Sequence, residues 1–107
     1  MTPAPDPSID ALLAAARAQF AAELPAKAAK VEALVALGAW DEARRAAHRL
    51  RGSAGTYGFV ELGASAGAVE DLLLESAGVP DGDGRARLEE QLRRLADLAG
   101  QAQGEAR

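Results

Sequence analysis

The chain has 107 residues, a formal net charge of −4, four aromatic residues per hundred and no cysteine. This length allows one small domain with a single core. The lack of cysteine excludes disulfides and thiolate metal sites, and the acidic total gives no electrostatic basis for nucleic-acid binding. No apolar run is long enough to span a membrane, and the N-terminus lacks the form of a signal peptide, so we expect a cytoplasmic protein with no membrane partner.

The first third of the chain predicts a short tail followed by two helices. Residues 1–7 are rich in proline and are predicted to be a disordered tail. Ser8 is a plausible N-cap for a first helix, and Pro25 suits the first turn of a second one that Gly38 ends. One kinked helix is the alternative. The residues expected on the buried faces are Ile9, Leu12, Leu13, Ala16 and Phe20, then Ala28, Val31, Leu34 and Val35.

Three further helices follow. We expect them from Trp40 to about Gly55, from Phe59 to about Ala77, and through the leucines beyond the glycine-rich loop at 78–84. The domain is predicted to span residues 8–103, with a frayed tail at 104–107. Alternating helices with short connections favour an all-α fold, an antiparallel up-down four-helix bundle with an additional N-terminal helix.

The single histidine, His48, lies on the third predicted helix. Apolar residues of this helix recur at alternating spacings of three and four, and at about 100° per residue His48 points roughly 120–130° away from that stripe. Arg51 and Gly52 lie one turn beyond it on the same face, and Arg44 one turn before it. Because glycine destabilises a helix interior, Gly52 in an alanine-rich helix suggests that a side chain is unwanted there. The stripe comprises Trp40, Ala43, Ala47, Leu50, Ala54 and Tyr57.

Each of these features also has a plainer interpretation. A lone helical histidine is usually an ordinary surface residue, and glycines such as Gly52 and Gly55 commonly end helices. The arginines around His48 could form only a solvated face near the helix C-terminus.

The segment from Ala46 to Glu70 resembles the histidine-containing phosphotransfer (HPt) domains of two-component phosphorelays. Their hallmark is His-x-Leu-Lys-Gly-Ser/Gly-Ala, then a glycine-containing turn and a second helix. The chain reads His-Arg-Leu-Arg-Gly-Ser-Ala from His48, with Arg51 in place of the usual lysine. It also resembles the phosphotransfer domain of the chemotaxis kinase, which carries a second histidine in the region of Gly67. The lack of that histidine favours a relay module, although a domain excised from a hybrid or chemotaxis-type kinase stays an alternative.

The resemblance implies a role for each residue near His48. His48 would accept a phosphoryl group from a receiver-domain phospho-aspartate and pass it to another receiver, with Arg51 contacting the phosphoryl oxygens and Gly52 leaving room for the partner. Docking residues would be Arg44, Arg45 and Gly55. The resemblance implies no kinase activity and no cofactor, because the receiver supplies the divalent metal. Partners would be response-regulator receiver domains and a sensor or hybrid histidine kinase, and we expect a monomer.

Glu70 is the second residue of interest. If the helices on either side of Gly58 are antiparallel, His48, ten residues before it, and Glu70, twelve after it, lie at nearly the same height. The resemblance to the chemotaxis-kinase domain implies that this glutamate hydrogen-bonds the histidine. A solvated surface carboxylate is an equal alternative.

Other function classes stay open on the sequence. A receiver-binding adaptor without phosphotransfer is one, although such a protein is expected to lack the histidine. A histidine-kinase dimerisation helix pair is another, but it normally has an acidic residue where Arg49 follows the histidine. A metal site or a hydrolase triad is disfavoured, because the only histidine has no ligand partner one turn away and Ser53 falls on the wrong side of the helix.

Overall fold

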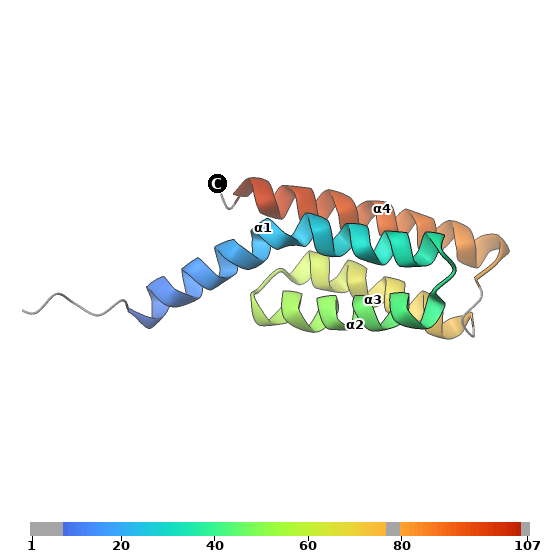
Figure 1. Cartoon of the computed structure of the whole chain (residues 1–107), viewed down its shortest axis with the longest axis horizontal. Coiled ribbons are helices and arrows are strands. Elements are labelled where there is room, and N and C mark those ends of the chain that lie inside the picture. Colours follow the sequence, from blue (N-terminus) through green and yellow to red (C-terminus); the bar gives the residue numbers. More distant parts are fainter. Residues whose placement is uncertain (1–7, 77–79, 106–107) are drawn as a thin grey trace, which may run out of the picture.

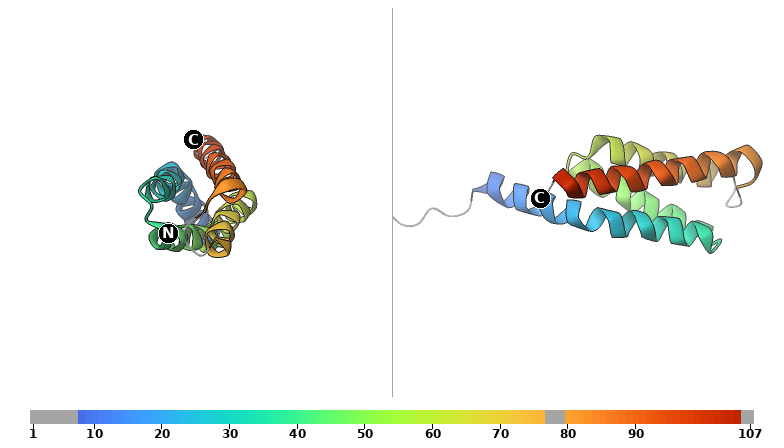
Figure 2. Two further views of the ribbon diagram at one scale, coloured as in Figure 1. Left: turned by 90° about the vertical axis from the view of Figure 1, so that its right-hand side faces the viewer. Right: turned by 90° about the horizontal axis from the view of Figure 1, so that it is seen from above.

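Four helices make up the part of the chain that the computed structural model describes, which is residues 8–76 and 80–105. They are α1 (Ile9–Ala36), α2 (Trp40–Thr56), α3 (Val60–Glu75) and α4 (Gly82–Glu105), and no strand occurs among these residues. Successive helices run in opposite directions, and each contacts two neighbours, α1 and α3 both lying against α2 and α4 (Figures 1 and 2). The predicted antiparallel four-helix bundle is confirmed.

The additional N-terminal helix is not present as a separate element. Residues 9–36 form one continuous helix, and Pro25 lies inside it. The side chain of Ser8 caps this helix as predicted, accepting a hydrogen bond of 3.0 Å from the backbone N–H of Ala11. Proline removes one backbone hydrogen bond, but Leu24 and Ala28 on either side of it are buried in the core, which holds the two halves in one helix.

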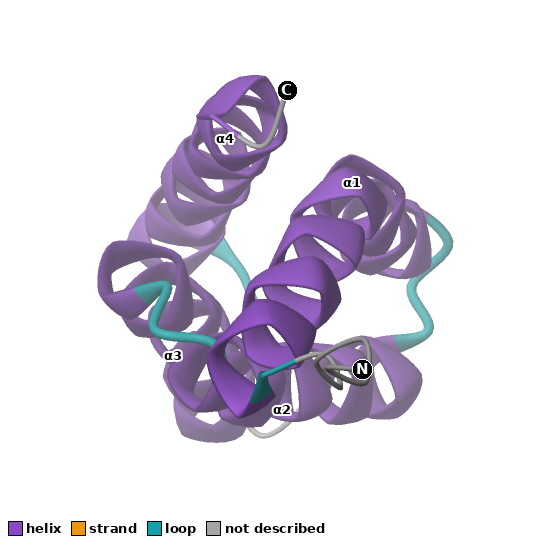
Figure 3. Ribbon diagram, turned by 90° about the vertical axis from the view of Figure 1, so that its left-hand side faces the viewer, coloured by secondary structure: helices purple, strands orange, loops and turns teal. Residues whose placement is uncertain are grey.

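The first turns of α1 also correct the predicted buried face. Ile9, Leu12 and Leu13 are exposed, and Phe20 is the first buried residue of the helix. The reason is length, because α1 has 28 residues whereas α2 has 17 and α3 has 16. Its N-terminal turns therefore run past the end of the bundle (Figures 1 and 3).

The core confirms the predicted stripes of the other helices. On α2 the buried residues are small apart from Leu50, so the neighbouring helices can approach closely. Trp40 and Tyr57 pack at the two ends of this stripe. The remaining stripes that the core buries are Leu62, Ala66, Val69 and Leu73 of α3, and Leu88, Leu92, Leu95, Ala99 and Ala102 of α4.

Glycines in the left-handed conformation end both α1 and α2. Gly38 has φ +73° and Gly58 has φ +81°, values that other residues rarely adopt. After Gly58 the backbone N–H of Phe59 donates to the carbonyl of Ala54 at 2.8 Å, which closes a Schellman motif. The turn between α2 and α3 is therefore short and well defined.

Aromatic packing ties this turn to α1. The ring of Phe20 lies 4.7 Å from that of Tyr57 and 5.8 Å from that of Phe59, measured between centroids. The Arg17 guanidinium lies 4.1 Å from the centre of the Phe59 ring, and its Nε donates to the Tyr57 carbonyl at 3.1 Å. These contacts fix the position of the α2–α3 turn relative to α1.

The observed ends of α4 differ from the expected ones by a few residues. It begins at Gly82, inside the predicted loop, and continues to Glu105, so Gly104 and Glu105 of the predicted tail are helical. The predicted tail at 1–7, residues 77–79 and residues 106–107 lie outside the described residues. None of the helices described is long and apolar enough to cross a membrane. The cytoplasmic location stays a prediction.

Candidate functional site

His48 lies in the middle of α2 and points away from the buried stripe, at the edge where α2 meets α3. Its side chain is 68% exposed, so the outward orientation predicted from the helical spacing is confirmed. Because the flanking Ala47 is buried in the core, the helix cannot rotate to bury the imidazole without exposing its apolar face. The ring is therefore presented to solvent by the packing of the bundle.

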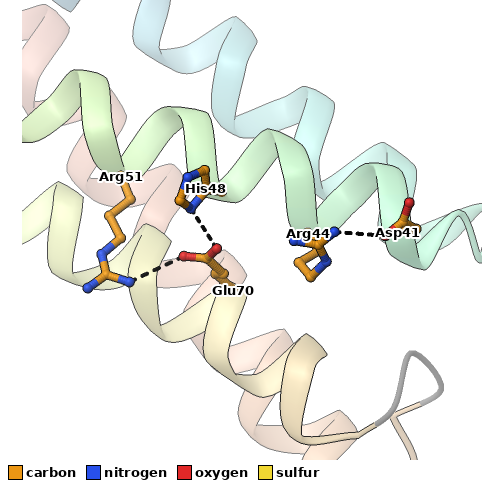
Figure 4. Close-up of polar contacts among 5 residues, drawn as sticks. All are labelled: Asp41, Arg44, His48, Arg51 and Glu70. Carbon is orange, nitrogen blue, oxygen red and sulfur yellow. Dashed lines mark hydrogen bonds and ion pairs between the residues drawn. The ribbon is translucent and has the colours of Figure 1, made fainter.

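Glu70 of α3 contacts the imidazole directly. Its Oε2 lies 2.7 Å from Nδ1 of His48, while only 8% of the Glu70 side chain is exposed (Figure 4). Of the two alternatives that the sequence left for Glu70, the structure has the contact with the histidine. Since an ionised carboxylate only accepts hydrogen bonds, Nδ1 carries the proton and donates it. In the neutral ring this leaves Nε2 unprotonated, with a lone pair available for attack.

Arg51 reaches the same carboxylate from the other side. Its Nη1 donates to Oε1 of Glu70 at 3.2 Å, and its side chain is 55% exposed. The family resemblance implied a place for this guanidinium at the phosphoryl group, and its bond to Glu70 was not predicted. A guanidinium has five N–H donors, so the bond to Glu70 leaves others for an anion beside His48.

Gly52 and Gly55 leave the surface around His48 open. A Cβ built on either glycine meets no atom of the protein within 4 Å. The bundle itself therefore does not require glycine at these positions, and their missing side chains affect only what approaches from outside.

Arg44 and Arg45 both form ion pairs with Asp41, a residue that was not among the predicted site residues. Arg44 lies 2.9 Å from one oxygen of Asp41, and Arg45 lies 2.9 Å from the other. The pKa of Asp41 is lowered below its usual value, mainly by the hydrogen bond from Arg44 and secondly by the charge of Arg45. The positive charge expected from Arg44 beside His48 is thus balanced by Asp41. The spacings of three and four residues along one helix would have been enough to predict these pairs.

The described residues offer no obvious place for a resident metal ion. No three histidine, cysteine, aspartate or glutamate side chains gather in these parts of the chain in a way that could hold one. The described features of the site are therefore an imidazole, a carboxylate, a guanidinium and open space.

A comparison with protein-family models matches residues 15–101 to the Hpt domain. The chain belongs to the Hpt domain family. The match covers most of the chain, including α2, α3 and the site between them. Hpt domains carry out histidine phosphotransfer in two-component systems, as intermediates rather than kinases, and interact with receiver domains and kinases. No curated protein and no solved structure matches the chain.

Proposed function

We propose that this Hpt domain accepts a phosphoryl group on Nε2 of His48 from the phospho-aspartate of one receiver domain and passes it to another. The observation that carries the proposal is the exposed imidazole whose Nδ1 is bonded to buried Glu70 at 2.7 Å. This arrangement holds the one tautomer in which the solvent-facing nitrogen is a nucleophile.

The transfer step can be followed at each atom. The Nε2 lone pair of His48 attacks phosphorus in line with the bond from phosphorus to the aspartyl oxygen, and that bond breaks to release the aspartate carboxylate. No proton moves to or from Nε2. The ring gains positive charge as the N–P bond forms, and the Glu70 carboxylate next to Nδ1–H stabilises that charge. Return of the group to a second aspartate is the reverse of this step.

The residues around His48 take supporting roles. We assign Arg51, through the N–H groups that Glu70 does not use, to the phosphoryl oxygens. Gly52 and Gly55 give the receiver room to approach, and Arg44 and Arg45, held by Asp41, lie on the docking surface. The metal ion belongs to the receiver, and this domain needs no cofactor of its own. The phosphate enters the relay from a sensor or hybrid histidine kinase, and the domain works as a monomer.

The test is incubation with a panel of phosphorylated receivers. We expect a label on the wild-type domain that is labile in acid and stable in base, as phosphohistidine is. His48→Gln should take up no label while its helical circular dichroism stays unchanged. Label retained on His48→Gln refutes the assignment of the acceptor. Receivers that bind the wild type without labelling it would identify an adaptor instead.

A further inference from the structure

Gly67 of α3 is in an unusual position among the glycines that the structure describes. A Cβ at Gly67 would lie 3.2 Å from Cδ of Arg51, 3.2 Å from its Nε and 3.5 Å from its Cζ. No other described glycine would bring a Cβ closer than 3.5 Å to a neighbour. The space that the missing side chain leaves is filled by the arginine of the site.

The contact lies along the part of Arg51 that sets the direction of its guanidinium. Nε and Cζ belong to the planar group, and Cδ is the last carbon before it. The side chain of Arg51 thus lies against Gly67. Its Nη1 then reaches Glu70, one turn further along α3 (Figure 4). The bond from Nη1 to Oε1 is 3.2 Å, at the long end of the normal range for N–H···O bonds. A Cβ at 3.2 Å requires its neighbour to give way by a few tenths of an ångström, and a lengthening of that size would take this bond beyond the normal range.

We propose that Gly67 is a positioning residue, whose bare backbone seats Arg51 so that its guanidinium holds Glu70 against His48. The inference rests on the proposed function only in its consequence for transfer. Among the described residues, Arg51 makes its one side-chain hydrogen bond to Glu70. With Arg51 displaced, Oε1 loses its donor, and the bond to Nδ1 of His48 alone sets the orientation of the carboxylate.

Gly67→Ala tests whether the bare backbone of Gly67 positions Arg51, and Gly63→Ala is the matched control. Both glycines are buried in α3 and both substitutions raise helix propensity alike, but a Cβ at Gly63 meets its nearest neighbour at an ordinary 3.5 Å. The first measurement is the heteronuclear NOE of the Arg51 Nε–H group. Its resonance is assigned as the one that disappears in Arg51→Ala. We expect Gly67→Ala to lower this NOE and Gly63→Ala to leave it unchanged.

The second measurement is the rate at which His48 takes up the phosphoryl group. We expect roughly a threefold loss in Gly67→Ala and none in Gly63→Ala, since a charged pair whose arginine is exposed contributes modestly. In an Arg51→Ala background, where no Cδ or guanidinium meets the new methyl, Gly67→Ala should have no further effect.

Two results would overturn the inference. One is an Arg51 Nε–H that stays as ordered in Gly67→Ala as in Gly63→Ala. The other is a Gly67→Ala loss that persists in the Arg51→Ala background, because the effect would then not run through the arginine. Failure of the proposed function looks different, since no variant would be labelled while the NOE still reports on the seat.

Discussion

Two carboxylates, Asp41 and Glu70, each bind two nitrogen-bearing side chains of α2, and they do so in different ways. Asp41 pairs with Arg44 and Arg45 of its own helix, and its side chain is 61% exposed. Glu70 comes from α3 and binds His48 and Arg51 across the helix interface, with a side chain that is almost fully buried. The Asp41 cluster lies within one helix and is exposed to solvent. The Glu70 cluster joins two helices, and its carboxylate is largely shielded from solvent.

The difference matters because solvent screens the ion pairs of Asp41, whereas the carboxylate of Glu70 is largely shielded from solvent. Exposed ion pairs contribute little, since water and salt screen them. A buried carboxylate must keep its partners, because leaving it unpaired is costly. Glu70 therefore holds the His48 ring in a fixed orientation, which a solvated aspartate could not do.

The largest effect is expected from Glu70→Ala. Without an acceptor at Nδ1 the ring of His48 is free to place its proton on Nε2, so the rate of phosphoryl uptake should fall on the order of ten- to a hundredfold. Ring ¹⁵N shifts report the tautomer directly, because the chain has a single histidine. Asp71→Ala, at the exposed neighbouring residue, is the control. An unchanged tautomer in Glu70→Ala would show that Glu70 does not fix the protonation of the His48 ring.

Gly52→Leu should slow transfer by about tenfold, because small misplacements of a reacting partner have large effects on rate. The protein should not lose stability, since a Cβ at this position meets no neighbour within 4 Å and leucine raises helix propensity by up to about 1 kcal/mol. Gly100→Leu on α4, which does not contact α2, gives the same gain in propensity away from His48. Single-turnover transfer and urea unfolding separate the two effects. Equal transfer rates in both variants would show that the receiver does not approach over Gly52.

Arg51→Met removes the guanidinium and keeps much of the aliphatic chain. We expect uptake to fall roughly threefold to tenfold, the value of a charge-assisted hydrogen bond discounted for the exposure of its donor. The dissociation constant for an unphosphorylated receiver should stay the same, as measured by titration calorimetry. Arg49→Met, at an exposed arginine two residues earlier, is the matched control. A loss confined to affinity would move Arg51 from the transfer step to the docking surface.

The smallest effect is expected from Asp41→Asn. Because the pKa of Asp41 is lowered in the folded state, its pairing with Arg44 and Arg45 stabilises the fold above the pKa of the unfolded chain. That contribution is lost as the pH falls through the lowered folded pKa. Urea midpoints should therefore differ slightly between wild type and variant at about pH 7 and converge as the pH falls through the lowered folded pKa of Asp41. Transfer by His48 should be unaffected, and a slower transfer would mean that the local cluster also serves the site.

Much of the fold follows from spacing along single helices. The stripe of α2 predicted which residues are buried and that His48 faces outward, because 3.6 residues per turn fixes the relative directions of side chains on one helix. The break at Gly38 was equally predictable, since only glycine is comfortable at that backbone conformation. The motif around His48 pointed to the family that the comparison found.

Contacts between helices could not be predicted from the spacing of residues along single helices. The sequence could not decide whether Glu70 meets His48, and it gave no sign that Arg51 lies over Gly67 and binds the same carboxylate. It also placed Ile9, Leu12 and Leu13 in the core, although the bundle ends before it reaches them. A helical repeat determines angles within one helix. Which residues meet depends on the rotation, height and length of its neighbours, and those are fixed only when the four helices pack together.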